Sequence, residues 1–309
     1  MPVASAVNAC LIANPAAGRG RGARRLPRVR EALAAVGITD VRLTRGPGDE
    51  RLLAAQAASE GIETIVALGG DGTWGNVARG ILEAKRDARL VPIAAGTGND
   101  FPHALGLPAG DAAAMARIAA NGNFVRVDVG WANDIAFLNV AGLGLETEVL
   151  RSVRAIRSMN GPLVYVAAAL PLLRSYRGLK ASIQVDDQPP GPLSPFCAIV
   201  VSNGPRFGGG FKVAPGATVT DGKVDLIAVR DADPMRRLQL FVRARLGTHI
   251  GQPEVNRQPV AKLLIQFAEK PLLDADGELH AIDATELRIH VDPGAIRVGT
   301  NDIRMEIVA

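Results

Sequence analysis

The sequence predicts a protein of two lobes: an α/β N-terminal lobe with a parallel sheet, and a C-terminal lobe that is a mostly antiparallel β-sandwich. Over the first 130 residues, continuous apolar runs alternate with segments of helical spacing, a pattern typical of parallel strands covered on both faces. After Val127 the apolar runs become short and are separated by turns such as Asp221-Gly222. A length of 309 residues allows about two domains.

The individual elements follow from the same patterns. In the first lobe, strands are expected at residues 7–13, 41–44, 64–68 and 91–95, and helices at 23–36, 48–59, 74–84 and from about 99. In the second lobe, strands are expected at residues 135–140, 181–185, 196–201, 224–229, 263–267 and 287–291. Helices are expected there at residues 147–158, 163–175 and 234–246.

The composition is that of a globular protein, with 48% hydrophobic and 21% charged residues. The net charge of +4 permits an anionic partner without choosing between nucleotide, membrane and nucleic acid. The two cysteines, Cys10 and Cys197, lie in apolar runs far apart and are expected to be buried free thiols, which fits a reducing compartment. The longest apolar run, residues 163–173, is too short to cross a bilayer, which needs about 20 residues. No secretory leader is recognised at the N-terminus.

Three expected strand ends carry glycine-rich loops, at residues 14–20, 69–73 and 96–101. Ligands of a doubly wound sheet gather at the carboxyl ends of its strands, where such loops meet. Glycines let the backbone approach a phosphate, and a helix N-terminus behind each loop favours negative charge. One such loop would mean little, but three in one lobe indicate a phosphate-binding site.

The second loop contains an aspartate, Asp71, which cannot favourably face a bare phosphate. Its presence indicates a cation beside a nucleotide, or a hydrogen bond to a hydroxyl. Residues 18–23 and 70–75 also fit the dinucleotide fingerprint G-x-G-x-x-[GA], so a nicotinamide enzyme is an alternative. Against it, Asp71 would lie against the pyrophosphate, and no residue marks a hydride-transfer site. No loop ends in Gly-Lys-Ser/Thr, which excludes an ordinary P-loop enzyme.

Residues 68–73 (LGGDGT) and 91–101 (VPIAAGTGNDF) resemble the diacylglycerol kinase catalytic-domain family. That family includes bacterial diacylglycerol and phosphatidylglycerol kinases and eukaryotic sphingosine and ceramide kinases, and it is related to NAD kinases. Further similarities cover nearly the whole chain, at residues 14–18, 128–130 (DVG), 139–144 (NVAGLG), 202–204 (SNG), 208–210 (GGG), 215–225 and 274–278 (DADGE).

The resemblance implies an NAD-kinase-like α/β lobe for ATP at residues 1–130, to which residues 295–309 return. It implies a β-rich lobe for the lipid substrate at residues 131–294, with the active site between the lobes. The residues implied to contact ATP are Asn14, Pro15, Ala16, Ala17, Gly18, Thr44, Gly70, Asp71, Gly72, Thr73, Trp74, Gly75, Asn76, Thr97 and Asp100. Among these, Asp71 would organise the phosphates and a catalytic Mg²⁺.

The same resemblance implies that Glu278 is the general base that takes the proton of the lipid hydroxyl. Phosphoryl transfer needs charge compensation, alignment and such a base more than covalent help. A structural Mg²⁺ site is implied at Thr218, Asp221 and Lys223, with the lysine coordinating through its backbone carbonyl. Asp128 would connect that ion to the active site through water.

The function expected is transfer of the γ-phosphoryl group of ATP to a lipid hydroxyl. Diacylglycerol is the first candidate acceptor, and phosphatidylglycerol or a sphingoid base comes next. Two alternatives stay open: a soluble small-molecule kinase resembling NAD kinase, and a catalytically weak nucleotide-binding regulator. Asn76 keeps the regulator open, because the family commonly has an acidic residue there, whereas Asp71 and Glu278 argue against it.

Residues 234–250 combine Arg236, Arg237, Arg243 and Arg245 with apolar residues, a pattern that indicates a helix lying on an anionic membrane. A helix packed on the sandwich with a solvated face is the alternative interpretation. We therefore expect a cytoplasmic protein that associates peripherally with the inner membrane face and has no nucleic-acid partner. The sequence leaves the oligomeric state open, a dimer included.

Overall fold

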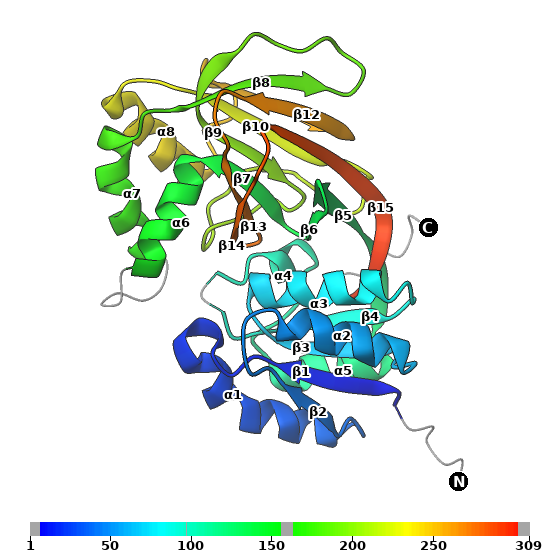
Figure 1. Cartoon of the computed structure of the whole chain (residues 1–309). Helices are drawn as coiled ribbons and strands as arrows, with labels where there is room; N and C mark the ends of the chain where they lie inside the picture. The colour runs from blue at the N-terminus through cyan, green and yellow to red at the C-terminus, as the bar shows by residue number, and fades with distance from the viewer. Residues whose placement is uncertain (1–6, 97, 156–162, 302–309) are drawn as a thin grey trace. The chain divides into compact units, whose positions relative to one another are not determined.

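The structure, a computed structural model, describes residues 7–96, 98–155 and 163–301. It divides into two compact units, Met1–Val127 with Gly294–Ala309, and Asp128–Pro293. Strands β5 (Asn123–Ala132) and β15 (Glu286–Thr300) contribute residues to both units (Figure 1). The strand pairings are parallel in the first unit and antiparallel in the second.

The first unit contains a parallel sheet in the order β2-β1-β3-β4, continued by the end of β15. Its strands are β1 (Ala9–Ala13), β2 (Asp40–Leu43), β3 (Thr64–Gly69) and β4 (Arg89–Ala94). Arg297 of β15 is in parallel register with Arg89 of β4. Every residue of β1 and β3 is buried, as expected for strands with helices on both faces.

Within the described residues, five helices accompany this sheet. They are α1 (Ala17–Ala34), α2 (Asp49–Ser59), α3 (Asp71–Glu83), α4 (Phe101–Ala104) and α5 (Ala112–Asn121). Helix α1 packs against α5, and α2 packs against α3 so closely that a Cβ on Gly80 would overlap the Arg51 carbonyl oxygen. Asp111 caps α5 by accepting the N–H groups of Ala113 and Ala114 at 2.9 and 3.1 Å.

The second unit is built from antiparallel strands in the order β14-β13-β7-β9-β8-β12-β15, with β10 and β11 continuing from β9. Strand β5 pairs with β6 and β15. The strands not yet given are β6 (Ile135–Phe137), β7 (Val140–Gly144), β8 (Leu179–Val185), β9 (Ser194–Ser202), β10 (Val224–Arg230), β11 (Val255–Val260), β12 (Lys262–Phe267), β13 (Leu272–Ala275) and β14 (Glu278–Ala281).

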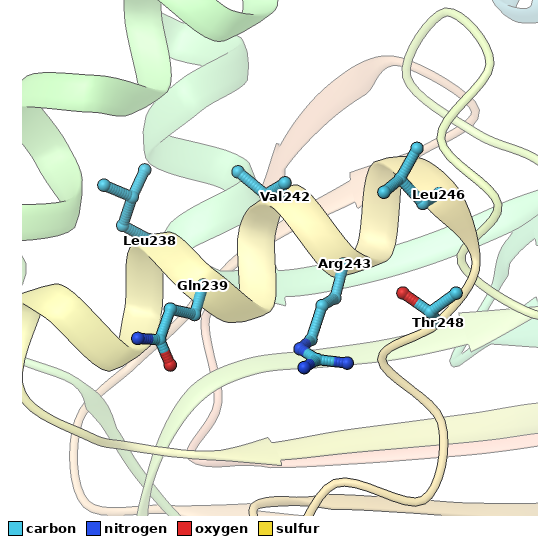
Figure 2. Close-up of a pocket in the computed structure, with 6 residues that line it drawn as sticks. All are labelled: Leu238, Gln239, Val242, Arg243, Leu246 and Thr248. Atoms are coloured by element: carbon cyan, nitrogen blue, oxygen red, sulfur yellow. The ribbon is translucent and has the colours of Figure 1, made fainter.

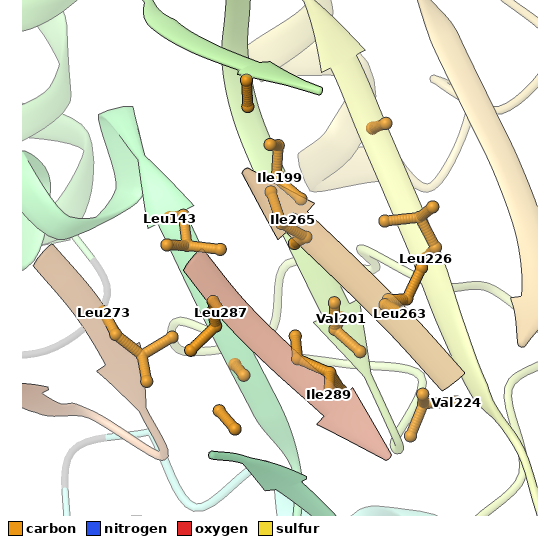
Figure 3. Close-up of a cluster of buried hydrophobic side chains, with 14 of the residues drawn as sticks. Leu143, Ile199, Val201, Val224, Leu226, Leu263, Ile265, Leu273, Leu287 and Ile289 are labelled. Atoms are coloured by element: carbon orange, nitrogen blue, oxygen red, sulfur yellow. The ribbon is translucent and has the colours of Figure 1, made fainter. Parts of the chain in front are cut away.

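A hydrophobic core packs most of these strands together (Figure 3). It contains Leu143, Ile199, Ile265 and Leu287, each of which is fully buried, and burial of such a side chain contributes about 1.5–3 kcal/mol. Helices α6 (Leu145–Ala155), α7 (Leu163–Ser175) and α8 (Pro234–Leu246) belong to the same unit. Helix α7 packs against both α6 and α8.

The expected fold class, a parallel α/β lobe followed by a mostly antiparallel β lobe, is confirmed. The prediction of a single strand at residues 135–140 was wrong, because two separate strands, β6 and β7, cover this region. The division has a physical reason: the N–H groups of Leu138 and Asn139 bind the Asp276 carboxylate instead of a neighbouring strand. Helix α5 and strands β5, β11, β13 and β14 were not expected.

Both cysteines are buried free thiols, as expected. Burial raises the pKa of each thiol to about 12, so neither is a ready nucleophile. Among the described residues, no helix combines the length and apolar character required to cross a membrane.

Candidate active site

In the first unit, Asn14 links three segments at the end of β1. Its Oδ1 accepts hydrogen bonds from the Ala16 and Ala17 N–H groups at 2.9 and 3.1 Å and so shapes the first loop. Its Nδ2 donates to Glu50 Oε1 at 2.8 Å and to Thr73 Oγ1 at 3.3 Å. The loops after β1 and β3 are therefore joined through one side chain, and that side chain also reaches α2.

The three glycine loops meet through backbone contacts that only glycine allows. A Cβ on Gly18, whose φ is +57°, would overlap the Ala95 carbonyl oxygen. A Cβ on Gly96 would lie 2.6 Å from the Gly70 Cα. Since real Cβ atoms do not approach so closely, the loops at residues 14–20, 69–73 and 96–101 pack at one place because they lack side chains there.

Asp71, in the first turn of α3, holds the third loop in place. Its carboxylate accepts the Asp100 N–H at 3.3 Å and the Phe101 N–H at 3.1 Å. The aspartate lies at the end of α3 where the helix dipole favours negative charge. The geometry gives Asp71 a positioning contact between two loops, which the sequence had not indicated.

The other residues that were expected to contact the nucleotide differ in burial and in hydrogen-bond partners. Thr44 is half-buried and follows β2, where its N–H donates to the Ala13 carbonyl at 3.0 Å. Trp74 is fully buried, and its Nε1 donates to the Ala67 carbonyl at 3.0 Å, so its side chain belongs to the core. Asn76 is also buried, inside α3, and Asp100 is buried beside Asp71. Thr97 lies outside the described residues.

Glu50 is a polar residue of this region that the sequence analysis missed. It is only 4% exposed, although it stands in the first turn of α2, where a glutamate is ordinarily solvated. Its hydrogen bond to Asn14 explains its burial. No local signal could have found it, because the two residues are 36 positions apart in sequence.

In the second unit, the β13–β14 hairpin turns at Asp276 and Gly277, which have φ values of +51° and +89°. Two positive φ values are typical of a type I′ turn, the expected structure for Asp-Gly. The Asp276 carboxylate accepts three backbone N–H groups, from Leu138 at 2.7 Å and from Asn139 and Val140 at 2.9 Å each. The turn is thus clamped to the segment that enters β7.

Glu278 is the first residue of β14 and directly follows this turn. It is half-buried and pairs in register with Ala275. Inside the turn, Asp274 Oδ1 accepts the Gly277 N–H at 2.8 Å. Two aspartates that bind backbone N–H groups therefore fix the position from which Glu278 projects.

The residues expected to hold a structural Mg²⁺ lie together on one turn before β10. Thr218, Asp221 and Lys223 are exposed, and Asp221 Oδ1 accepts the Lys223 N–H at 3.1 Å. The buried Asp128 reaches the same turn, where its Oδ2 accepts the Gly222 N–H at 2.7 Å. The described residues contain no cluster of three or more His, Cys, Asp or Glu side chains fit to hold a metal. The donors here are carboxylate, hydroxyl and carbonyl oxygens, which fit a partly hydrated Mg²⁺ in chemical type.

Comparison with known proteins identifies the class. A family profile described as "Diacylglycerol kinase catalytic domain" matches residues 8–132. A second, described as "YegS C-terminal NAD kinase beta sandwich-like domain", matches residues 139–300. The chain belongs to the diacylglycerol kinase family of lipid kinases, which are phosphotransferases.

Two relatives illustrate the breadth of the match. A diacylglycerol kinase of Bacillus subtilis (strain 168) is 30% identical over 87% of this chain and 88% of its own length. A protein of Pseudomonas aeruginosa (strain UCBPP-PA14) named "Probable lipid kinase YegS-like" is 31% identical over 84% of this chain and 83% of its own. A solved diacylglycerol kinase structure from Bacillus anthracis superposes with a TM-score of 0.71, covering 97% of this chain and 98% of that one. At 23% identity, that last match shows the shared fold.

Proposed function

We propose that the protein transfers the γ-phosphoryl group of ATP to the hydroxyl of a membrane lipid, with diacylglycerol as the first candidate acceptor. The observation that carries the proposal is the meeting of three glycine loops at the strand ends of the first unit. Backbone that approaches this closely, beside the N-terminus of α3, provides N–H donors and a favourable dipole for a polyphosphate. Membership of a lipid kinase family supports the choice of acceptor.

In this proposal the first unit binds ATP and the second unit supplies the base. The nucleotide contacts come from residues 14–18, Thr44, residues 70–76, Thr97 and Asp100. The Trp74 side chain is buried in the core and supports the loop from below. Asp71 keeps the second and third loops together, and its negative charge suits a phosphate-bound Mg²⁺. Glu278, held by the clamped hairpin, accepts the proton of the lipid hydroxyl as it attacks.

Mg²⁺ would supply charge compensation for the phosphates. The turn that contains Thr218, Asp221 and Lys223 would hold a second, structural ion through side-chain and backbone oxygens. Asp128 supports this role because its carboxylate is buried and already bound to the same turn. Replacing Asp221 with Asn should weaken Mg²⁺ binding in calorimetry, whereas replacing Asp283, whose side chain is 97% exposed on another turn, should not.

The test of the function is a transfer assay with labelled ATP against diacylglycerol, phosphatidylglycerol, a sphingoid base and NAD. The proposal expects label in a lipid, and loss of transfer in Asp71→Asn and Glu278→Gln. Transfer that survives both substitutions would contradict the assigned roles. Label in NAD would favour the small-molecule kinase, and ATP binding without transfer to any acceptor would favour a regulator.

Contact with the membrane is part of this proposal, and the structure changes which residues of α8 can make it. Arg237 is buried and bonds to the Asp231 carboxylate, and Arg236 is bound by Glu254 at 2.8 and 2.9 Å. Arg245 donates to the Gly210 carbonyl and lies over the Phe211 ring. Of the four expected arginines, Arg243 and Arg245 are exposed, and Arg243 lines an open pocket.

The exposed face of α8 carries several large apolar side chains. Met235, Val242 and Leu246 are 64%, 50% and 62% exposed, and their spacing of seven and four residues places them on one stripe. Figure 2 shows Leu238, Val242 and Leu246 on one side of the helix and Arg243 on the other. Residues 234–253 contain four arginines and no acidic residue. An apolar stripe in a basic segment fits an anionic bilayer.

Flotation with phosphatidylglycerol-containing vesicles tests this contact. Replacing Val242 and Leu246 with Glu should weaken binding roughly 100-fold, since burying these two side chains is worth about 3 kcal/mol or more. The matched control is Leu193→Glu, at a leucine that is 60% exposed elsewhere in the same unit. Equal flotation of all three proteins would contradict the assignment of α8.

A further inference from the structure

A buried carboxyl pair lies behind the hairpin that carries Glu278. Glu146 is the second residue of α6, the helix that directly follows β7, and Asp274 lies on β13 beside β7. Asp274 is fully buried, and the Oε1 atom of Glu146 is shielded from solvent although part of its side chain stays accessible. The Glu146 carboxyl group occupies the Cβ position of Gly142, the residue opposite Asp274, and interaction with Asp274 raises the pKa of Glu146.

The backbone makes room for this pair. Gly142 of β7 stands opposite Asp274 in the strand register. A Cβ at Gly142 would overlap the Glu146 carboxyl group, so the missing side chain provides the space that the carboxyl fills. The pair is therefore built into the strand arrangement.

Two carboxyl groups in a hydrogen bond must share a proton, because carboxylates have no donor. Burial raises the pKa of Glu146 well above its usual value, and the negative charge of Asp274 and the hydrogen bond to it act in the same direction. A position in the first turn of a helix would by itself favour the ionised form. Burial, the charge of Asp274 and the hydrogen bond to it all oppose the helix dipole, so we assign the shared proton to Glu146.

The pair is connected to Glu278 through one residue. Asp274 accepts from Glu146 on one side and from the Gly277 N–H on the other, at 2.8 Å. Gly277 immediately precedes Glu278, and Asp276 clamps the opposite side of the turn. We propose that Glu146 is a positioning residue whose protonated carboxyl donates to Asp274 and thereby fixes the turn that presents Glu278.

Other titratable groups on elements packed against α6 are Glu278 and His280 on β14, Cys197 on β9 and Tyr176 after α7. Burial raises the pKa of the Cys197 thiol to about 12 and raises that of the Tyr176 hydroxyl, so both stay neutral around pH 8. On α6 itself Glu148 is ion-paired with Arg151, and α7 carries Arg174. Asp274 is thus the carboxyl group that bears most directly on Glu146.

The inference rests on the proposed function for its effect on turnover, but not for its structural part. As pH rises through the raised pKa, Glu146 loses its proton, two adjacent carboxylates repel each other, and the hairpin loosens. Glu146→Gln keeps a neutral donor at the same place and has no proton to lose. Glu146→Ala removes the donor, and a misplaced base can lower turnover on the order of 10²-fold.

The experiment compares wild type, Glu146→Gln, Glu146→Ala and the exposed-site control Asp283→Asn. In infrared spectra, the carbonyl stretch of a protonated carboxylic acid should persist at neutral pH in wild type and Asp283→Asn and be lost in Glu146→Gln. Hydrogen exchange of the 274–281 segment should quicken at alkaline pH in wild type relative to Glu146→Gln. Turnover should follow: wild type loses activity at high pH, Glu146→Gln does not, and Glu146→Ala is slow with an unchanged KM for ATP.

An infrared spectrum without that band would overturn the inference, and so would identical pH profiles of hydrogen exchange in wild type and Glu146→Gln. A wild-type protein that transfers no phosphoryl group to any lipid would instead overturn the proposed function. In that case the band and the exchange difference would still support the positioning of the hairpin.

Discussion

The glycine loops of the first unit and the β13–β14 hairpin of the second are both held by an aspartate carboxylate, but the two carboxylates differ in burial. In each, an aspartate accepts backbone N–H groups: Asp71 binds those of Asp100 and Phe101, and Asp276 binds those of Leu138, Asn139 and Val140. Asp276 is buried with three such bonds, whereas Asp71 is only half-buried. The comparison teaches that one aspartate joins two strands of a buried core and the other joins two loops of the candidate nucleotide site.

Replacing Asp276 with Ala should have the largest effect on stability. It would leave three buried N–H groups without an acceptor, at a cost of about 3 kcal/mol or more in the free energy of unfolding. Urea unfolding followed through the second unit measures the change. Asp276→Asn, which keeps one acceptor oxygen, should lose less, and Asp283→Ala should lose almost nothing. A small loss of unfolding free energy in Asp276→Ala would show that Asp276 contributes no more to stability than Asp71 does.

Gly96→Ala should affect nucleotide binding more than folding. The added Cβ would lie 2.6 Å from the Gly70 Cα, so the two loops must separate, at a cost of about 1–3 kcal/mol. Calorimetric titration with ATP should show weaker binding by roughly 10-fold or more. Gly110→Ala is the matched control, because a Cβ there meets nothing within 4 Å. Equal ATP affinities in the two variants would show that the loops tolerate separation.

The smallest expected effect is a pH dependence of the free energy of unfolding that arises from His249 in the second unit. Burial lowers the pKa of His249, which is hydrogen-bonded to the Val213 carbonyl at 2.9 Å. Below a pH of about 6.5 the imidazole is protonated in the unfolded chain but stays neutral in the folded chain. The free energy of unfolding therefore falls as the pH decreases toward the lowered pKa of His249. Unfolding curves between pH 7 and 5 should show a shallower loss in His249→Gln than in wild type. Parallel curves would remove His249 as the cause.

The fold and the loops were predictable because their signals are local. Each of the three loops carries its glycines directly after an apolar strand, so the sequence indicates both the turn and its place in the sheet. The Asp276-Gly277 turn was likewise predictable from two adjacent residues. What Asp276 binds was not, since its partners lie 136–138 positions away and depend on how β13 pairs with β7.

Other features were hidden for related reasons. Glu146 and Glu50 each stand in the first turn of a helix, which is an ordinary solvated position for glutamate, and only tertiary packing buries their carboxyl groups. In α8 the number of arginines was visible, but their ion pairs were not. Those pairs join Arg236 to Glu254 and Arg237 to Asp231, across 18 and 6 positions.

The central claim is that the first unit binds the nucleotide and the second supplies the base for transfer. The most direct measurement is ATP affinity and single-turnover phosphoryl transfer in Glu278→Gln beside wild type. The account predicts the same Kd for ATP within about twofold, and transfer to diacylglycerol slower by roughly 10²–10⁴-fold, the usual contribution of a general base. Transfer at the wild-type rate, or loss of ATP binding in this variant, would contradict it.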